Sequence, residues 1–254
     1  MRTKFRPVSL IPMASKNLLD ARAAIAHLRK ADPVMAQLID QVGAFKLARH
    51  PEHFQALVRA IMFQQLAGAA CQAILDRFVA LFPDSAFPTP AQVLEATDEQ
   101  LRGAGLSRQK LAYLRDLAKH VGEEALNFKR FPRMDDEEII TELIRVKGIG
   151  RWTAEMFLMF NLRRPDVLPV GDLGFQTAAM RAYGWKQLPT AKELKELGER
   201  WRPYRSVAVW YLWQMIHLKL PGDDIGSRRK PSKVKPAKAR RATPKRPKRA
   251  VAAK

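Results

Sequence analysis

The chain has 254 residues, of which 47% are hydrophobic, and a formal net charge of +20. This apolar content suffices for a buried core, and the strongly basic balance points to a polyanionic partner. The single cysteine, Cys71, excludes an internal disulfide, a cysteine-rich zinc site and a four-cysteine iron–sulfur cluster. No apolar run is long enough to span a membrane, so we expect a cytoplasmic protein with no membrane partner.

Residues 1–17 are expected to form an irregular leader, in which Pro7 and Pro12 bracket an apolar run too short for a signal peptide. Over residues 18–226 apolar side chains recur at helical spacing, and no segment alternates as a strand would. The expected fold class is therefore all-α, with about ten to twelve helices and with Cys71 as a small core residue. The expected helices include residues 54–66, 71–82, 91–96, 98–103, 108–121, 151–162, 174–183, 191–201 and 203–220.

Four consecutive acidic residues, 135–138, precede another apolar stretch. A paired-carboxylate site for acid/base catalysis is one interpretation. We favour the other, in which these side chains occupy a first helical turn, because the helix dipole stabilises negative charge there.

The last segment, residues 227–254, carries 13 Lys and Arg and no acidic residue, which leaves +7 of the total +20 on residues 1–226. It lacks the large apolar side chains that offset the entropy of ordering a chain, and we expect it to be disordered. A solubilising tail is one interpretation. We favour an arm that tethers DNA non-specifically, because binding through neutralised phosphates depends steeply on salt.

A glycine-rich turn, Val146–Gly150, links two of the expected helices. Its two glycines let the backbone turn with positive φ and approach a ligand closely, while Ile149 packs inward. The exposed amides converge on the start of the next helix, which is a ready site for a phosphate. An ordinary αα-corner is the alternative, but the longer pattern Leu-x-x-Val-x-Gly-Ile-Gly-x-x-Thr-Ala favours a helix-hairpin-helix element. The predicted residues for binding the DNA backbone are Val146, Lys147, Gly148, Ile149, Gly150, Arg151 and Thr153.

Asp172 ends a loop that Pro165, Pro169 and Gly171 stiffen. From its position alone it is an N-cap for the following helix, a role that stabilises by about 1 kcal/mol. A lone carboxylate at a fixed distance in sequence from a DNA-binding turn also suggests an enzyme that acts on the bound strand. The two roles are compatible.

The hairpin and Asp172 together resemble the helix-hairpin-helix (HhH-GPD) DNA glycosylases, in particular the 3-methyladenine DNA glycosylase II group. Over residues 50–220 the resemblance is also carried by segments 61–68, 87–90, 105–110, 166–172 and 199–206. It implies two interlocked helical subdomains in a glycosylase core over residues 18–226. It also implies a monomeric, nucleoid-associated enzyme whose partner is double-stranded DNA with alkylated bases.

The resemblance makes Asp172 the catalytic residue. An ionised carboxylate stabilises the positive charge that develops at the sugar C1′ as the N-glycosidic bond breaks, and it can orient the attacking water. A glycosylase that also cleaves the strand needs an amine nucleophile. Related enzymes with that activity carry a lysine at the position of Trp152, so this chain is expected to be monofunctional and to leave an abasic site.

The resemblance also assigns residues that flip and recognise the base. It places the wedge that fills the vacated stack at Leu66, beside Gln65; in the less favoured alternative Leu66 is a core residue and the glutamines lie on the surface. It places the base pocket at Trp152, Met156, Leu173 and Trp213, where aromatic faces would attract a cationic purine. Met156 and Leu173 depart from the tyrosines of familiar members. Three further tryptophans, Trp185, Trp201 and Trp210, are expected to serve core packing.

No metal site and no cofactor are expected, because the five histidines show no ligand spacing. The lone cysteine conflicts with an iron–sulfur endonuclease or mismatch enzyme. A monovalent cation at the hairpin carbonyls is a feature of the family that residue types do not test. The remaining alternative is an architectural DNA-binding protein without enzymatic activity, in which Asp172 would serve only as a cap.

Overall fold

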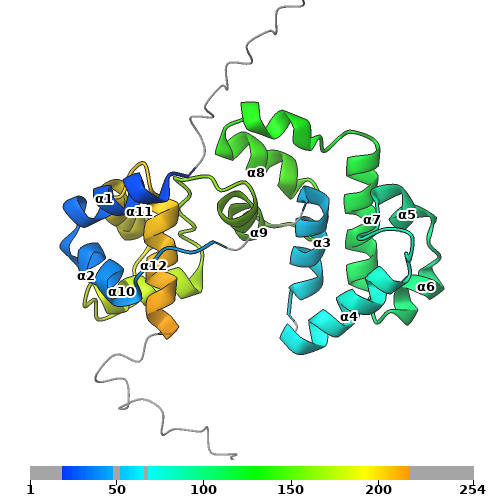
Figure 1. The fold of residues 1–254 in the computed structure, drawn as a ribbon, viewed down its shortest axis with the longest axis horizontal. Coiled ribbons are helices and arrows are strands. Elements are labelled where there is room, and N and C mark those ends of the chain that lie inside the picture. The colour runs from blue at the N-terminus through cyan, green and yellow to red at the C-terminus, as the bar shows by residue number, and fades with distance from the viewer. Residues whose placement is uncertain (1–18, 48–51, 66–67, 218–254) are drawn as a thin grey trace, which may run out of the picture. The chain divides into compact units, whose positions relative to one another are not determined.

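The computed structural model describes residues 19–47, 52–65 and 68–217. Within these ranges it contains twelve α-helices, one 3₁₀-helix and one π-helix, and no strand, which confirms the all-α prediction (Figure 1). The expected leader and basic tail, residues 1–17 and 227–254, lie outside the described residues. Among the helices that are described, none is long and apolar enough to cross a membrane.

One group of helices is built around α7 (Arg108–Gly122), which packs against three others. The other members of this group are α3 (His53–Phe63), α4 (Gly68–Ala80), α5 (Pro90–Glu95), α6 (Asp98–Gly103), the 3₁₀-helix η1 (Phe128–Arg133), α8 (Asp136–Ile144), α9 (Arg151–Met156) and the π-helix η2 (Phe157–Asn161). Among them α8 packs against α9, and α3 packs against η2, which continues α9.

A second group combines the two ends of the described chain. The last helix, α12 (Arg205–His217), packs against the first two, α1 (Ala21–Ala31) and α2 (Pro33–Val42), and against α10 (Leu173–Ala182). The helix α11 (Ala191–Glu199) lies between α10 and α12 in the chain. Because the N-terminal helices join the C-terminal ones, the two groups are interlocked in sequence, as the resemblance implies (Figure 1).

The helices begin and end where their side chains satisfy the free backbone groups. Capping boxes, in which an N-cap side chain and the third helical residue bond each other's backbone amides, open α5, α6, α8 and α11. In α8 the box is formed by Asp135 and Glu138, and Asp136 faces Arg164 at 3.5 Å. The interpretation of residues 135–138 as the start of a helix is therefore confirmed, and these carboxylates have structural partners.

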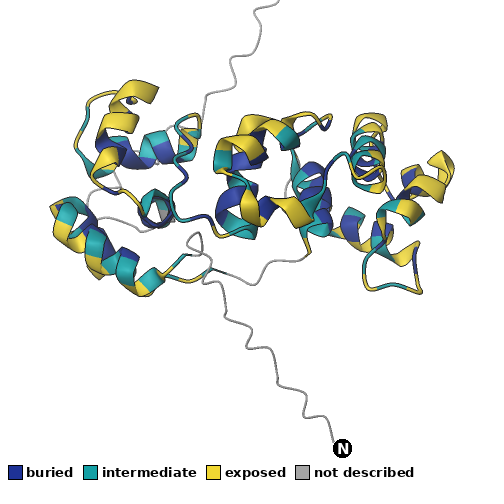
Figure 2. Ribbon diagram, turned by 90° about the horizontal axis from the view of Figure 1, so that it is seen from above, coloured by how far each residue is buried: buried dark blue, intermediate teal, exposed yellow. Residues whose placement is uncertain are grey.

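Most helices turn an apolar side toward their neighbours and leave a polar side exposed, whereas α12 is buried at every residue from Ser206 to Leu212 (Figure 2). Cys71 is fully buried, as expected, and its thiol donates to the carbonyl oxygen of Met62 at 3.0 Å. Burial raises the pKa of this thiol, which suits a core residue rather than a reactive one. Trp201 and Trp210 are buried as predicted, whereas Trp185 is half-buried.

Two local features depart from the expected pattern. The helix expected over residues 151–162 is α-helical only to Met156 and continues as the π-helix η2, a form that is often found at functional sites. The 3₁₀-helix η1 was not predicted, because Pro132 inside it and the short length leave no helical periodicity in the sequence.

Candidate active site

Asp172 is the N-cap of α10. Its Oδ1 accepts a hydrogen bond from the Phe175 amide at 2.5 Å, which confirms the capping role. The carboxylate has two further donors that a cap does not need. The indole Nε1 of Trp152 donates to Oδ2 at 2.7 Å, and that of Trp213 donates to Oδ1 at 2.8 Å. Three N–H groups from three elements therefore fix the direction of this carboxylate.

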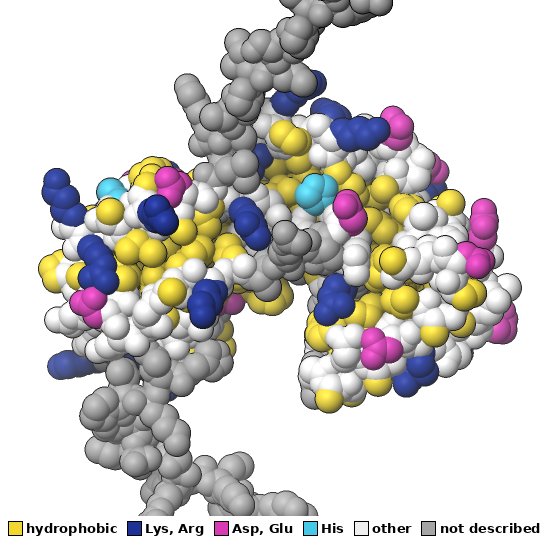
Figure 3. Space-filling view, viewed as in Figure 1, with side chains coloured by type: hydrophobic (Ala, Val, Ile, Leu, Met, Phe, Trp, Pro, Cys, Tyr) yellow, Lys and Arg dark blue, Asp and Glu magenta, His cyan; other side chains and the backbone are white. Residues whose placement is uncertain are grey.

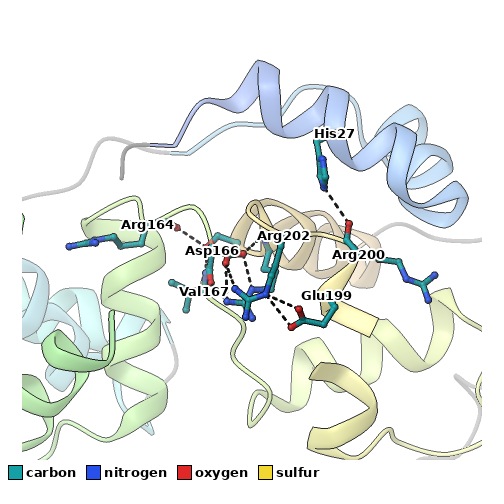
Figure 4. Close-up of polar contacts among 9 residues, drawn as sticks. His27, Arg164, Asp166, Val167, Glu199, Arg200 and Arg202 are labelled. Carbon is teal, nitrogen blue, oxygen red and sulfur yellow. Dashed lines mark hydrogen bonds and ion pairs between the residues drawn. The ribbon is translucent and has the colours of Figure 1, made fainter. Parts of the chain in front are cut away.

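The loop that carries Asp172 is anchored at its start by Asp166 (Figure 4). The Asp166 carboxylate accepts from Arg202 Nη1 at 2.7 Å and from Arg205 Nε at 2.8 Å. Next to it, the Ser206 hydroxyl donates to the Arg164 carbonyl oxygen at 2.7 Å and accepts from the Val167 amide at 2.9 Å. Charge-assisted bonds of this kind are stronger than neutral ones, so the loop is held in one position.

The predicted hairpin lies between the end of α8 and the start of α9. Gly148 has φ +84°, and a Cβ built on it would lie 2.2 Å from Cδ2 of Tyr113, so only glycine fits there. Gly150 differs from the expectation: its φ is −91°, and a Cβ on it would meet nothing within 4 Å. Val146 and Ile149 are buried and join the hairpin to the core.

Two side chains outside the hairpin hold its backbone. The Asp116 Oδ2 accepts from the Lys147 amide at 2.8 Å, and its Oδ1 lies 3.4 Å from the Lys147 ammonium. The side-chain amide of Gln64, at the end of α3, donates to the Gly148 carbonyl oxygen at 2.8 Å. The amide of Lys147 thus has an internal partner, and the role of Lys147 in binding the DNA backbone stays a prediction. The Gly148 carbonyl is also engaged, and the hairpin cation stays a prediction.

Two other residues predicted to bind the DNA backbone, Arg151 and Thr153, have contacts within the protein. The guanidinium of Arg151 bonds Glu137 and, one helical turn further on, Glu155 at 3.1 Å, so two carboxylates accept hydrogen bonds from it at the start of α9. Burial raises the pKa of Glu155, although Arg151 acts in the opposite direction. Thr153 is buried and lines a cavity together with residues of α3, and its contact with the DNA backbone stays a prediction.

The start of α9 is nevertheless open to an anion. Its N-cap is Gly150, which provides no side-chain hydrogen bond to the first turn, and Arg151 and Trp152 at that turn are exposed. The unpaired amides of a helix N-terminus and the positive end of its dipole favour a negative group. A Cβ built on Gly150 would meet nothing within 4 Å, so the backbone there is accessible.

Three of the four predicted pocket residues lie at the carboxylate. Trp152 and Trp213 bond it directly, and Leu173, the first residue of α10, is 64% exposed beside it. The fourth, Met156, lines a cavity of about 290 Å³ between α3 and the α9–η2 segment. The described lining residues are Ala56, Arg59, Ala60, Phe63, Thr153, Met156, Phe157, Phe160 and Asn161.

Two lining residues relate the cavity to the tryptophans that bond Asp172. Met156 follows Trp152 by one helical turn, so the two side chains share a face of α9. Phe160 stacks on Trp213, with ring centroids 5.7 Å apart and planes inclined by 22°. Sequence analysis missed Arg59, Phe63 and Phe160, although residues 56, 59, 60 and 63 form a helical stripe beside the buried stripe of α3.

The predicted wedge follows α3. Gln65 is exposed and has φ +59°, a backbone conformation that is rare outside glycine and marks a sharp turn after the helix. Leu66 lies outside the described residues. Among the described residues no group of three or more His, Cys, Asp or Glu side chains could hold a metal ion.

Comparison with known proteins agrees with this geometry. Residues 58–203 match the model of the HhH-GPD superfamily base excision DNA repair protein. The chain is 35% identical to the alkylbase DNA glycosidase-like protein mag2 of Schizosaccharomyces pombe, over 80% of this chain and 97% of that protein. It is 33% identical to DNA-3-methyladenine glycosylase 1 of the same organism, over 76% of this chain and 86% of that protein.

Solved structures give the same result. The Schizosaccharomyces pombe 3-methyladenine DNA glycosylase Mag1, in complex with abasic DNA, superposes with a TM-score of 0.69 at 33% identity, over 78% of this chain and 98% of that one. The DNA-3-methyladenine glycosidase of Bacillus halodurans superposes with a TM-score of 0.69 at 38% identity, over 75% and 88% of the two chains. The chain therefore belongs to the HhH-GPD superfamily of base excision DNA repair proteins, and it is a DNA glycosylase, a hydrolase of N-glycosidic bonds.

Proposed function

We propose that this glycosylase excises alkylated purines, 3-methyladenine and 7-methylguanine among them, from double-stranded DNA by simple hydrolysis. The observation that carries the proposal is the carboxylate of Asp172, held by the indoles of Trp152 and Trp213 next to a cavity with aromatic walls. The two solved structures described above, one from Schizosaccharomyces pombe and one from Bacillus halodurans, are both named for 3-methyladenine. A purely architectural role would need no indole donors on the carboxylate.

The chemistry requires little more than this carboxylate. As the bond between C1′ and the base breaks, positive charge develops on the sugar, and the negative charge of Asp172 stabilises it. The fixed direction of the carboxylate would also orient the attacking water. An alkylated purine that carries a positive charge departs as a neutral molecule, so it needs no acid to protonate it.

Access to the bond requires the nucleotide to leave the stack, at a cost of a few kcal/mol that is smaller for damaged pairs. In our proposal the open start of α9 binds a backbone phosphate, and Gln65 with Leu66 fills the vacated position. The flipped base enters the cavity that Met156 and Phe160 line. There it stacks on aromatic side chains, a contact that is worth about 1–3 kcal/mol per base.

We propose that the enzyme is monofunctional. Cleavage of the strand would need an amine that attacks C1′, and the position at which related enzymes carry that amine holds Trp152. In this structure the Trp152 side chain bonds Asp172 instead. The enzyme would act as a monomer on DNA and need no cofactor.

The test is release of methylated bases from alkylated DNA by the full chain, followed by chromatography. We expect 3-methyladenine and 7-methylguanine to appear, and the strand to break at the resulting abasic sites only after treatment with alkali. No release of either base would overturn the proposed substrate class. Strand breakage without alkali would overturn the monofunctional assignment alone.

On the face of the molecule shown in Figure 3, the described Lys and Arg side chains are spread among Asp and Glu side chains and form no continuous basic patch. The basic segment 227–254, which lies outside the described residues, would supply additional phosphate contacts. Removing it should flatten the dependence of DNA affinity on salt concentration, measured by fluorescence anisotropy, without changing which bases are released. An unchanged slope would show that the segment does not contact DNA.

A further inference from the structure

The end of α3 is tied to two neighbouring helices. The helix ends at Phe63, and the backbone of Gln64 is already extended (φ −61°, ψ 129°). One carbonyl group of the last turn, that of Met62, accepts hydrogen bonds from the ammonium of Lys110 on α7 and, at 3.0 Å, from the thiol of Cys71 on α4. The last carbonyl groups of a helix have no partner within the helix, so these two donors fix the position at which α3 stops.

Gln64 connects this fixed end of α3 to the hairpin. Its side-chain Nε2 donates to the carbonyl oxygen of Gly148 at 2.8 Å, in a half-buried place where a hydrogen bond is stronger than in water. The amide of the same peptide group, that of Ile149, donates to the Val146 carbonyl oxygen at 3.1 Å. Because a peptide group is planar, holding its two polar atoms fixes its orientation. The hairpin is therefore held against the end of α3 by a single side chain of that end.

The residue that follows Gln64 has an unusual backbone. Gln65 is exposed, and its φ of +59° lies in the left-handed region, which costs free energy for a residue with a Cβ. Such a conformation persists only where the surrounding structure imposes it, and it often occurs at functional positions. One such constraint is the preceding side chain, which is bonded to Gly148. The turn at Gln65 thus starts from a point that is fixed relative to the hairpin.

We propose that Gln64 is a positioning residue for base flipping, because it ties the turn at Gln65 to the hairpin. The inference rests on the proposed function, in which Gln65 belongs to the wedge and the start of α9 binds a backbone phosphate. The strand is held at one of these points and the vacated position is filled from the other, so flipping depends on the distance between them. If the turn moves relative to the hairpin, the position is filled less often and the base returns to the stack. Gln64 is not among the described residues that line the cavity or bond Asp172, so it acts by holding the wedge.

The test compares single-turnover excision of 7-methylguanine from two duplexes, one with cytosine opposite the lesion and one with an abasic analogue opposite it. The second lesion has no pairing partner, so it leaves the stack at a lower cost and depends less on the wedge. Gln64→Met keeps the length of the side chain and removes the donor. We expect it to slow excision of the paired lesion by about 5- to 10-fold, the effect of one neutral hydrogen bond, and of the unpaired lesion by less than about twofold. Gln64→His, which keeps an N–H donor at a similar distance from the backbone, should lose less on the paired lesion.

The matched control is Gln72→Ala, because the side-chain amide of Gln72 bonds Asp76 one turn further along its own helix, α4, at 2.7 Å. It should leave both rates unchanged. An equal loss on the two duplexes would overturn the inference and show that Gln64 supports the fold or the chemistry, and an unchanged rate on the paired lesion would overturn it as well. No excision from either duplex by the wild-type chain would instead contradict the proposed function, which includes 7-methylguanine. If Gln64→Met is unfolded at the assay temperature, Gln64→Glu, which has the shape of glutamine and no donor when ionised, replaces it, and the ratio of the two rates decides.

Discussion

Replacing Asp172 with Asn is expected to slow base release by about 100-fold or more, while the affinity for DNA stays close to that of the wild-type chain. The substitution removes the negative charge that, in the proposed mechanism, faces C1′. It also places an amide group, itself a donor, against one of the two indole donors, Trp152 or Trp213, so that one of these bonds is lost. Asparagine caps a helix about as well as aspartate does, so α10 should remain stable.

The measurement is the rate of release of methylated purines at saturating enzyme, together with the affinity for the same duplex. Asp40→Asn is the matched control, because Asp40 forms an exposed ion pair with Arg29 on the surface of α2. It should leave the rate unchanged. Rapid excision by Asp172→Asn would remove the carboxylate from the mechanism, and a large loss of DNA affinity would show that the residue serves binding rather than catalysis.

Replacing Gly148 with Ala is expected to destabilise the protein by about 3 kcal/mol, the sum of the cost of a left-handed backbone and of overpacking. The new methyl group would stand 2.2 Å from the ring of Tyr113, on a residue with φ +84°. Tyr113 cannot move freely, because its hydroxyl accepts from the Gln109 amide at 2.7 Å. Thermal unfolding should show a Tm lower by roughly 6–12 °C, and DNA affinity should fall with it.

Gly150→Ala provides the matched control two residues away. Gly150 has an ordinary backbone conformation and open space around it, so the substitution should change stability by less than about 0.5 kcal/mol. It should still weaken DNA binding, because in the proposed function the strand approaches the start of α9 at this position. If Gly148→Ala unfolds at the wild-type temperature, the hairpin backbone is more adaptable than the structure indicates.

Features set by local sequence were predictable. The helix boundaries follow from capping side chains and prolines, and α6 over Asp98–Gly103 and the acidic start of α8 were predicted from such signals. The positive φ of Gly148 and the capping role of Asp172 also depend on a few neighbouring residues. These features need no knowledge of distant parts of the chain.

Features set by contacts between distant segments were not predictable. The cavity forms only because α3 meets the π-helix about 100 residues further along the chain, and sequence spacing alone gives no sign of that meeting. The same holds for Thr153, which faces α3, and for the Lys147 amide, whose partner Asp116 lies on α7. The bond between Arg151 and Glu155 could have been predicted, because the two residues are four apart on one helix. That Glu155 would compete with a phosphate for Arg151 could not.

The interlocked order of the helices has a consequence for synthesis on the ribosome. Helices α1 and α2 emerge first, yet the surface that covers them belongs to α12, which emerges last. Domains fold as units, and an N-terminal segment cannot complete its packing before the distant segment that covers it has been synthesised. The helices α1 and α2 therefore stay incompletely packed until nearly the whole described chain has been made. The helix that Asp172 caps, α10, packs on the same α12. A nascent chain therefore acquires its hairpin before its carboxylate is fixed, and it becomes a catalyst only when synthesis of the folded part is complete.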